Sequence, residues 1–137
     1  MKKLFIAITV AVTLAACKTL TAPVEVAQTP EQKAFALYGT FVAFEEVAAS
    51  LAVDATTPAA VKSALKTADA TAKPAADALL DAAQEVLKVK VQVDAGATTS
   101  DKLTIVNARL VEWVTEAQPK ILALQCAVNP KQKVCQK

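Results

Sequence analysis

Glycine is almost absent from this chain. Only two of its 137 residues are glycine, Gly39 and Gly96, whereas about thirty are alanine. Alanine loses no side-chain entropy when it enters a helix, and glycine loses the most backbone entropy. The composition therefore predicts an all-α fold, and the length is that of a single domain.

A first helix is predicted from the capping pattern at residues 29–32. Thr29 is the expected N-cap, Pro30 the first helical residue and Gln32 the second half of a capping box. The helix should end near Val53. Its apolar stripe has helical spacing and consists of Leu37, Phe41, Phe44, Ala48 and Leu51, widened by Phe35 and Tyr38. We expect Gly39 to pack closely against another helix, with a kink as the alternative.

A second helix is expected to run to about Asp94. Thr57 is its predicted cap, Pro58 its first residue and Gly96 the residue that closes it. Its stripe is Val61, Leu65, Ala68, Ala72, Ala76, Leu79, Ala83 and Val86. Pro74 removes one backbone hydrogen bond inside the stripe. The sequence therefore predicts a kink at Pro74, and the alternative is a split into two helices.

The segment KVKVQV, residues 88–93, alternates with the period of a strand. Its valines also continue the helical stripe, and a lone strand would have no partner elsewhere, so we expect a helix here.

A third helix should follow residues 97–100, with a kink at Pro119. Its stripe is Leu103, Val106, Leu110, Trp113, Ala117, Ile121 and Leu124.

Three amphipathic helices with short connections favour antiparallel neighbours. The sequence thus predicts a small antiparallel three-helix bundle over residues 29–128, or a four-helix bundle if the second helix splits at Pro74. Residues 129–137 form a tail in this interpretation.

Residues 1–16 have the three parts of a secretory signal. Lysines occupy positions 2 and 3, residues 4–14 are almost entirely apolar, and small residues precede Cys17. The apolar run of about a dozen residues is shorter than the ~20 that span a bilayer. We therefore expect a cleaved signal helix.

The sequence Leu14-Ala15-Ala16-Cys17 resembles the lipobox of bacterial lipoproteins. The resemblance implies that Cys17 carries diacylglycerol and that its new amino terminus is acylated, for example with palmitate. More than one acyl chain is needed for stable anchoring. Lys18 stands where an aspartate would retain an enterobacterial lipoprotein in the inner membrane. The resemblance therefore implies the outer membrane, and we expect the periplasmic face. Residues 17–28 would form a lipidated tether, with roughly 34 Å of reach for its part after Cys17.

The chain has three cysteines, an odd number that calls for an explanation in a secreted protein. If Cys17 carries lipid, Cys126 and Cys135 can pair in an oxidising compartment. Their ten-residue ring would add roughly 2.7 kcal/mol of stability. Two free thiols are the alternative. Because two sulfurs without any histidine fall short of a zinc site, we expect no metal.

The remaining residues give little support for catalysis or nucleic-acid binding. Histidine is absent, and two glycines cannot form a phosphate-binding loop. The acidic pairs look like solvated helix faces; they are Glu45 and Glu46, Asp77 and Asp81, and Glu112 and Glu116. Without the two signal-peptide lysines, the 15 basic residues fall to 13, which equals the 13 acidic residues. We therefore expect no enzyme, no cofactor and no nucleic-acid partner.

These exclusions favour a lipid-anchored protein that binds another envelope protein through a helix face. A structural or stress lipoprotein of the envelope is the alternative. The runs FALYGTFVAFEEVAASL and TPAAVKSALKTADATAKPAADALLDAA resemble small alanine-rich helical proteins of phages and prophages. That resemblance covers about residues 33–115 and implies a role in lysis or in superinfection exclusion. Trp113 is expected in the core, and Lys131 and Lys133 in a small basic loop.

Overall fold

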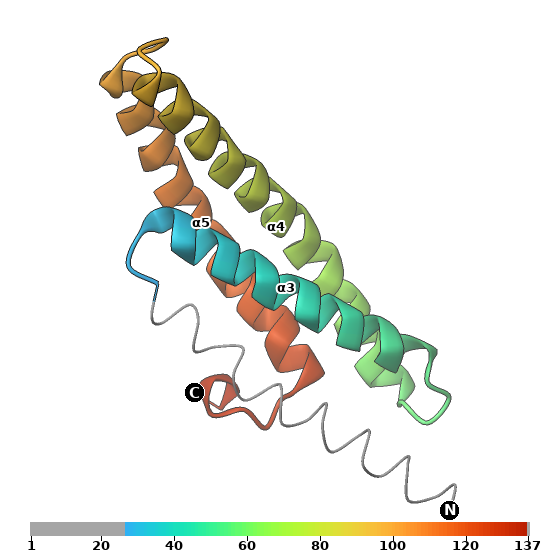
Figure 1. The fold of residues 1–137 in the computed structure, drawn as a ribbon. Helices are drawn as coiled ribbons and strands as arrows, with labels where there is room; N and C mark the ends of the chain where they lie inside the picture. Colours follow the sequence, from blue (N-terminus) through green and yellow to red (C-terminus); the bar gives the residue numbers. More distant parts are fainter. Residues whose placement is uncertain (1–26, 137) are drawn as a thin grey trace, which may run out of the picture.

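A computed structural model describes residues 27–136, which form three long helices (Figure 1). They are α3 (Pro30–Val53), α4 (Ala59–Asp94) and α5 (Ser100–Val128), and a short 3₁₀ helix, η1 (Lys133–Cys135), follows. The described residues contain no strand, so the fold is all-α as predicted, and residues 88–93 are helical. The predicted signal peptide, Cys17 and most of the tether lie outside the described residues.

α3 begins with the capping box that the sequence predicts. The Thr29 hydroxyl accepts a hydrogen bond from the backbone N–H of Gln32 at 3.2 Å. In return, the Gln32 side-chain oxygen accepts one from the backbone N–H of Thr29 at 3.2 Å. Pro30 needs no acceptor at the first helical position because it has no N–H. The start of α3 is thus determined locally by three residues.

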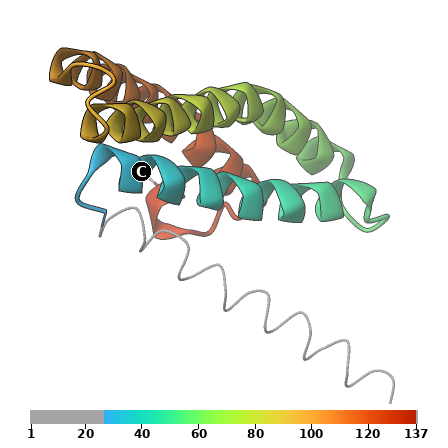
Figure 2. The same ribbon diagram turned by 45° about the horizontal axis from the view of Figure 1, so that its top comes forward.

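α4 continues through Pro74 without a break, so the four-helix alternative is wrong. Figure 2 shows α4 curving along its length. The predicted start was one residue early, because Pro58 has an extended ψ of 144° and acts as the N-cap. Gly96 closes the helix with a φ of +69°, a left-handed conformation that glycine adopts without strain. α5 likewise continues through Pro119.

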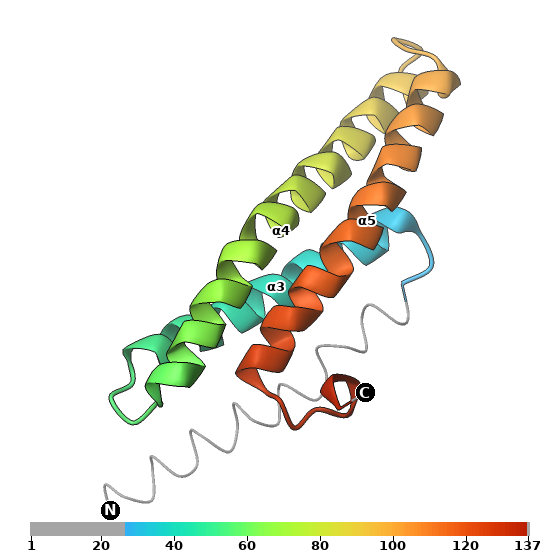
Figure 3. The same cartoon turned by 180° about the vertical axis from the view of Figure 1, so that it is seen from behind.

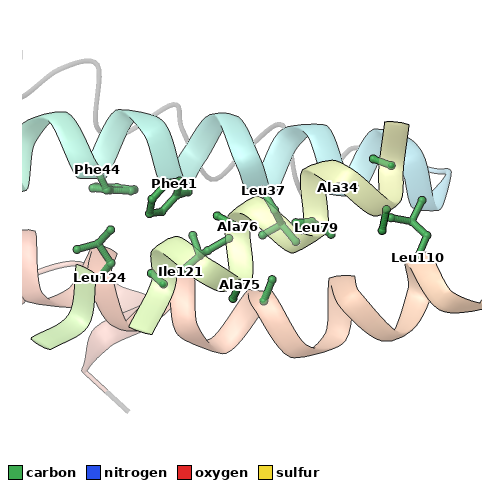
Figure 4. Close-up of a cluster of buried hydrophobic side chains, with 14 of the residues drawn as sticks. Ala34, Leu37, Phe41, Phe44, Ala75, Ala76, Leu79, Leu110, Ile121 and Leu124 are labelled. Atoms are coloured by element: carbon green, nitrogen blue, oxygen red, sulfur yellow. The ribbon is translucent and has the colours of Figure 1, made fainter. Parts of the chain in front are cut away.

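One apolar core lies between the three helices (Figure 4). Most of the predicted stripe residues lie in it. The fully buried large side chains are Phe41, Phe44, Leu65, Leu79, Val86, Leu110, Ile121 and Leu124. Two stripe predictions were wrong: Phe35 is 40% exposed, on the side of α3 away from the core, and Val61 is 37% exposed in the first turn of α4.

α4 and α5 form a long antiparallel hairpin that extends past the amino-terminal end of α3 (Figures 1 and 3). An ion pair between Arg109 Nη1 and Glu85 Oε2, at 3.7 Å, connects α5 to α4. A second pair, between Lys73 Nζ and Glu45 Oε1 at 2.6 Å, connects α4 to α3. α3 covers only part of the hairpin (Figures 1 and 3). One side of α3 faces no other helix of the bundle.

Asp54 follows the last residue of α3 and organises the turn into α4. Its Oδ1 accepts hydrogen bonds from the backbone N–H and from the hydroxyl of Thr56, each at 2.8 Å. These two bonds hold the pKa of Asp54 below its ordinary value of 3.8, and the backbone bond has the larger effect. A lowered folded-state pKa stabilises the protein above the unfolded-state pKa, and this contribution is lost as pH falls through the folded-state value.

We therefore expect wild type to lose stability relative to Asp54→Asn when the pH is lowered from about 5 to about 2. The asparagine oxygen can accept the same two hydrogen bonds but does not titrate. Urea unfolding of both proteins, followed by circular dichroism across this range, measures the difference. Parallel stability profiles for the two proteins would contradict the role of the Asp54 carboxylate.

Candidate functional site

The side of α3 that faces away from the core is apolar. Phe35 and Val42 are 40% and 43% exposed, and Gly39 is exposed between them. Three partly buried residues flank this line, namely Ala36, Tyr38 and Ala43. We name these six residues the outer face of α3. Their spacing follows successive turns of one helix, so the six residues form a continuous strip.

Gly39 lies at the centre of this strip and has open space around it. Apart from its chain neighbours and the backbone of its own helix, a Cβ atom added to Gly39 would meet no atom of the described residues within 4 Å. The expectation that Gly39 packs closely against another helix of this chain was therefore wrong. A glycine inside a helix costs about 1 kcal/mol relative to alanine. No contact within residues 27–136 offsets that cost at Gly39.

α3 is apolar on both of its sides. Its inner side carries Leu37, Phe41 and Phe44, which are buried in the core. Among the described residues, α3 is the one helix that by length and composition could cross a membrane, a property that core helices of bundles share. Only 28% of its most apolar 18-residue window is buried. A helix that is apolar all round is normally buried all round, so the outer face lacks a cover.

Charged side chains lie only at the ends of the outer face, since residues 34–44 carry none. At the carboxyl end, Glu46 is exposed, and Glu45 accepts the hydrogen bond from Lys73 described above. That bond raises the pKa of the Lys73 ammonium. At the amino end, Gln32 and Lys33 are exposed. The uncharged run is the sequence signal that could have identified this face before the fold was known.

The acidic pairs considered in the sequence lie on solvated faces. Asp77, Asp81 and Glu112 are exposed, and Glu116 pairs with Lys120 within one helix at 2.6 Å. Asp69 Oδ1 is buried and has no hydrogen-bond partner within residues 27–136, but a single oxygen is not a ligand set. Nowhere in that range do three histidine, cysteine or acidic side chains meet in a way that could hold a metal ion.

The carboxyl-terminal tail folds back on the last turns of α5. A disulfide joins Cys126 and Cys135, the pair expected from the sequence, with 5.5 Å between their Cα atoms. The buried Gln125, which directly precedes the ring, donates a side-chain hydrogen bond to Gln132 inside it. The two ring lysines, Lys131 and Lys133, are exposed. Trp113, expected in the core, is partly buried and packs against it.

The chain matches no protein-family model, no curated protein and no solved structure. The outer face of α3 is therefore judged by its own geometry. It is a helical surface with three large side chains (Phe35, Tyr38 and Val42), three small residues and no charge, and it suits docking rather than chemistry.

Proposed function

We propose that this protein is a non-catalytic lipoprotein of the bacterial envelope that docks a helix of a protein partner on the outer face of α3. The observation that carries the proposal is the exposed Gly39 between the exposed Phe35 and Val42. A glycine in a helix surface lets a second helix approach closely, and this gain can offset its cost in helix propensity.

The anchor in this proposal is the lipid on Cys17. α3 begins at Pro30, directly after the tether, so the domain would stay within a few tens of Å of the bilayer. We place the protein in the outer membrane, because Lys18 follows Cys17 and no aspartate is present there, and we propose that it faces the periplasm.

A protein helix is a better occupant than the bilayer itself. Helices that lie in a membrane surface usually carry lysine and arginine beside their apolar face. Here the carboxyl end of the outer face carries the exposed Glu46, which an anionic membrane surface would repel. A fluid lipid surface also gains nothing specific from the gap at Gly39. Both observations favour a packed helix–helix contact.

Photo-crosslinking in cells tests the proposal. A photo-crosslinking amino acid in place of Val42 should give protein adducts that mass spectrometry identifies, whereas the same group in place of Ile105 should not. Ile105 is a matched control because it is apolar, 63% exposed and lies near the start of α5 rather than on α3. Adducts with lipid alone from position 42 would overturn the proposed docking.

Gly39→Leu separates docking from folding. The added side chain has room in the bundle and improves helix propensity, so the variant should be more stable than wild type by up to about 1 kcal/mol. The same side chain should block a close helix approach and remove the adducts from position 42. Adducts that persist in this variant would show that Gly39 is not at the contact.

The anchor has a separate test in Cys17→Ser. Without the thiol, the precursor cannot receive diacylglycerol, so we expect an unmodified precursor that is hindered in reaching the outer membrane while the bundle still folds. Intact-mass analysis and membrane fractionation measure both effects. A variant that partitions into membranes like wild type after signal cleavage would contradict lipid anchoring.

A further inference from the structure

We infer that the occupant of the outer face of α3 is the same face of a second copy, packed antiparallel with the helices crossing at Gly39. This inference rests on the proposed function, because it names the protein partner for the same surface. A two-fold symmetric contact must be complementary to itself. The residues on either side of Gly39 meet that condition.

In an antiparallel pair centred on Gly39, each residue faces the position equally far on the other side of the centre. Phe35 then faces Ala43 of the second copy, and Ala36 faces Val42. Phe35 and Val42 each meet an alanine of the second copy, so these parts of the two surfaces can interdigitate. The crossing point itself is Gly39, where the absence of a side chain allows the two backbones to approach most closely.

The polar ends of the face also match in this orientation. Gln32 faces Glu46 of the second copy. The side-chain oxygen of Gln32 already accepts bonds from the backbone N–H groups of Gln28 and Thr29, which leaves its N–H₂ group available as a donor. Glu46 is exposed and can accept from it. The antiparallel pair would thus have a charge-assisted hydrogen bond at each end.

The same residues disfavour a parallel pair. It would bring the Glu46 side chains of the two copies together, and like charges at a contact are unfavourable. In the antiparallel pair, the two Glu46 residues lie about 21 Å apart along the helices at 1.5 Å per residue. The acidic end of α3 therefore determines the orientation.

The antiparallel pair is compatible with two anchors in one bilayer. The two Pro30 residues, where the tethers enter α3, would lie about 27 Å apart along the pair. Each tether reaches roughly 34 Å when extended. Confinement of both copies to one membrane surface raises their effective concentration, so a contact of one helix face can suffice.

Engineered cysteines in the full chain, expressed in cells with an oxidising periplasm, test the inference. Gly39→Cys places a thiol at the two-fold axis and should give a covalent dimer of twice the mass on a non-reducing gel. Phe35→Cys alone and Ala43→Cys alone should stay monomeric, and their co-expression should give the mixed dimer. Ile105→Cys is the exposed control and should stay monomeric.

The outcomes separate this inference from the proposed function. Dimers from Phe35→Cys alone would overturn the antiparallel orientation. If Gly39→Cys stays monomeric while the photo-crosslinker at position 42 gives adducts with a different protein, the second copy is the wrong occupant and the docking function stands. If position 42 gives no protein adduct at all, both proposals fail.

Discussion

Replacing Phe44 with alanine is expected to lower the free energy of unfolding by about 3–5 kcal/mol. Phe44 has no exposed surface and points toward Leu124 of α5 in the core (Figure 4). The loss combines the removed apolar surface with the cavity that the neighbouring side chains cannot fill completely. Because domains of this size are stable by only about 5–15 kcal/mol, the variant should lose a large share of its stability.

Phe35→Ala is the matched control for this prediction. It makes the same chemical change in the same helix, but Phe35 is 40% exposed, so its loss should stay below about 1 kcal/mol. Urea unfolding of the full chain gives both values, and the dependence on urea should be similar in the two proteins. Equal losses in the two variants would contradict the orientation of α3 on the hairpin.

The double variant Cys126→Ser, Cys135→Ser is expected to lose about 2–3 kcal/mol. The disulfide limits the freedom of the unfolded tail, and its two cysteines are nine residues apart in sequence. In the folded protein the disulfide also holds Gln132 near the buried Gln125. Without it, the Gln125 side chain can lose its hydrogen bond to Gln132 while it stays buried, which is unfavourable. The destabilisation should therefore centre on the end of α5.

A reducing agent provides the control for the disulfide prediction. Dithiothreitol should lower the unfolding midpoint of wild type to that of the serine variant and should leave the serine variant unchanged. Thermal unfolding with and without the reagent measures both effects. A wild-type midpoint that does not respond to reduction would mean that the disulfide contributes nothing to stability.

Local signals in the sequence were enough to locate the helices. The capping box of Thr29 and Gln32 requires atoms of one turn only, and Gly96 closes α4 because glycine tolerates a positive φ. The stripe of α5 was predicted correctly because side chains at three- and four-residue spacing share one helix face wherever the helix packs. Leu110, Ile121 and Leu124 are all buried.

Three features depended on distant residues: the sequence left the effect of Pro74 open, and it predicted the surroundings of Phe35 and Gly39 wrongly. Pro74 removes one hydrogen bond, but the loss is tolerated because Ala72, Ala75 and Ala76 around it are buried in the bundle. Phe35 is apolar in the same way as Phe41, and only the direction of α4 and α5 shows which of them faces the core. The surroundings of Gly39 likewise depend on where the other helices lie.

Within residues 27–136, the sequence by itself located the three helices to within a residue or two and indicated that Cys126 can pair with Cys135, because caps, apolar period and ring size are local properties. Only the tertiary structure decided that α3 lies across part of a longer hairpin and leaves its second apolar side uncovered. The physical reason is that the hydrophobic effect has no direction, so an apolar residue in the sequence does not show which neighbours will cover it. Its burial is decided by the helices that happen to reach it, and none of the helices in residues 27–136 covers the outer face of α3.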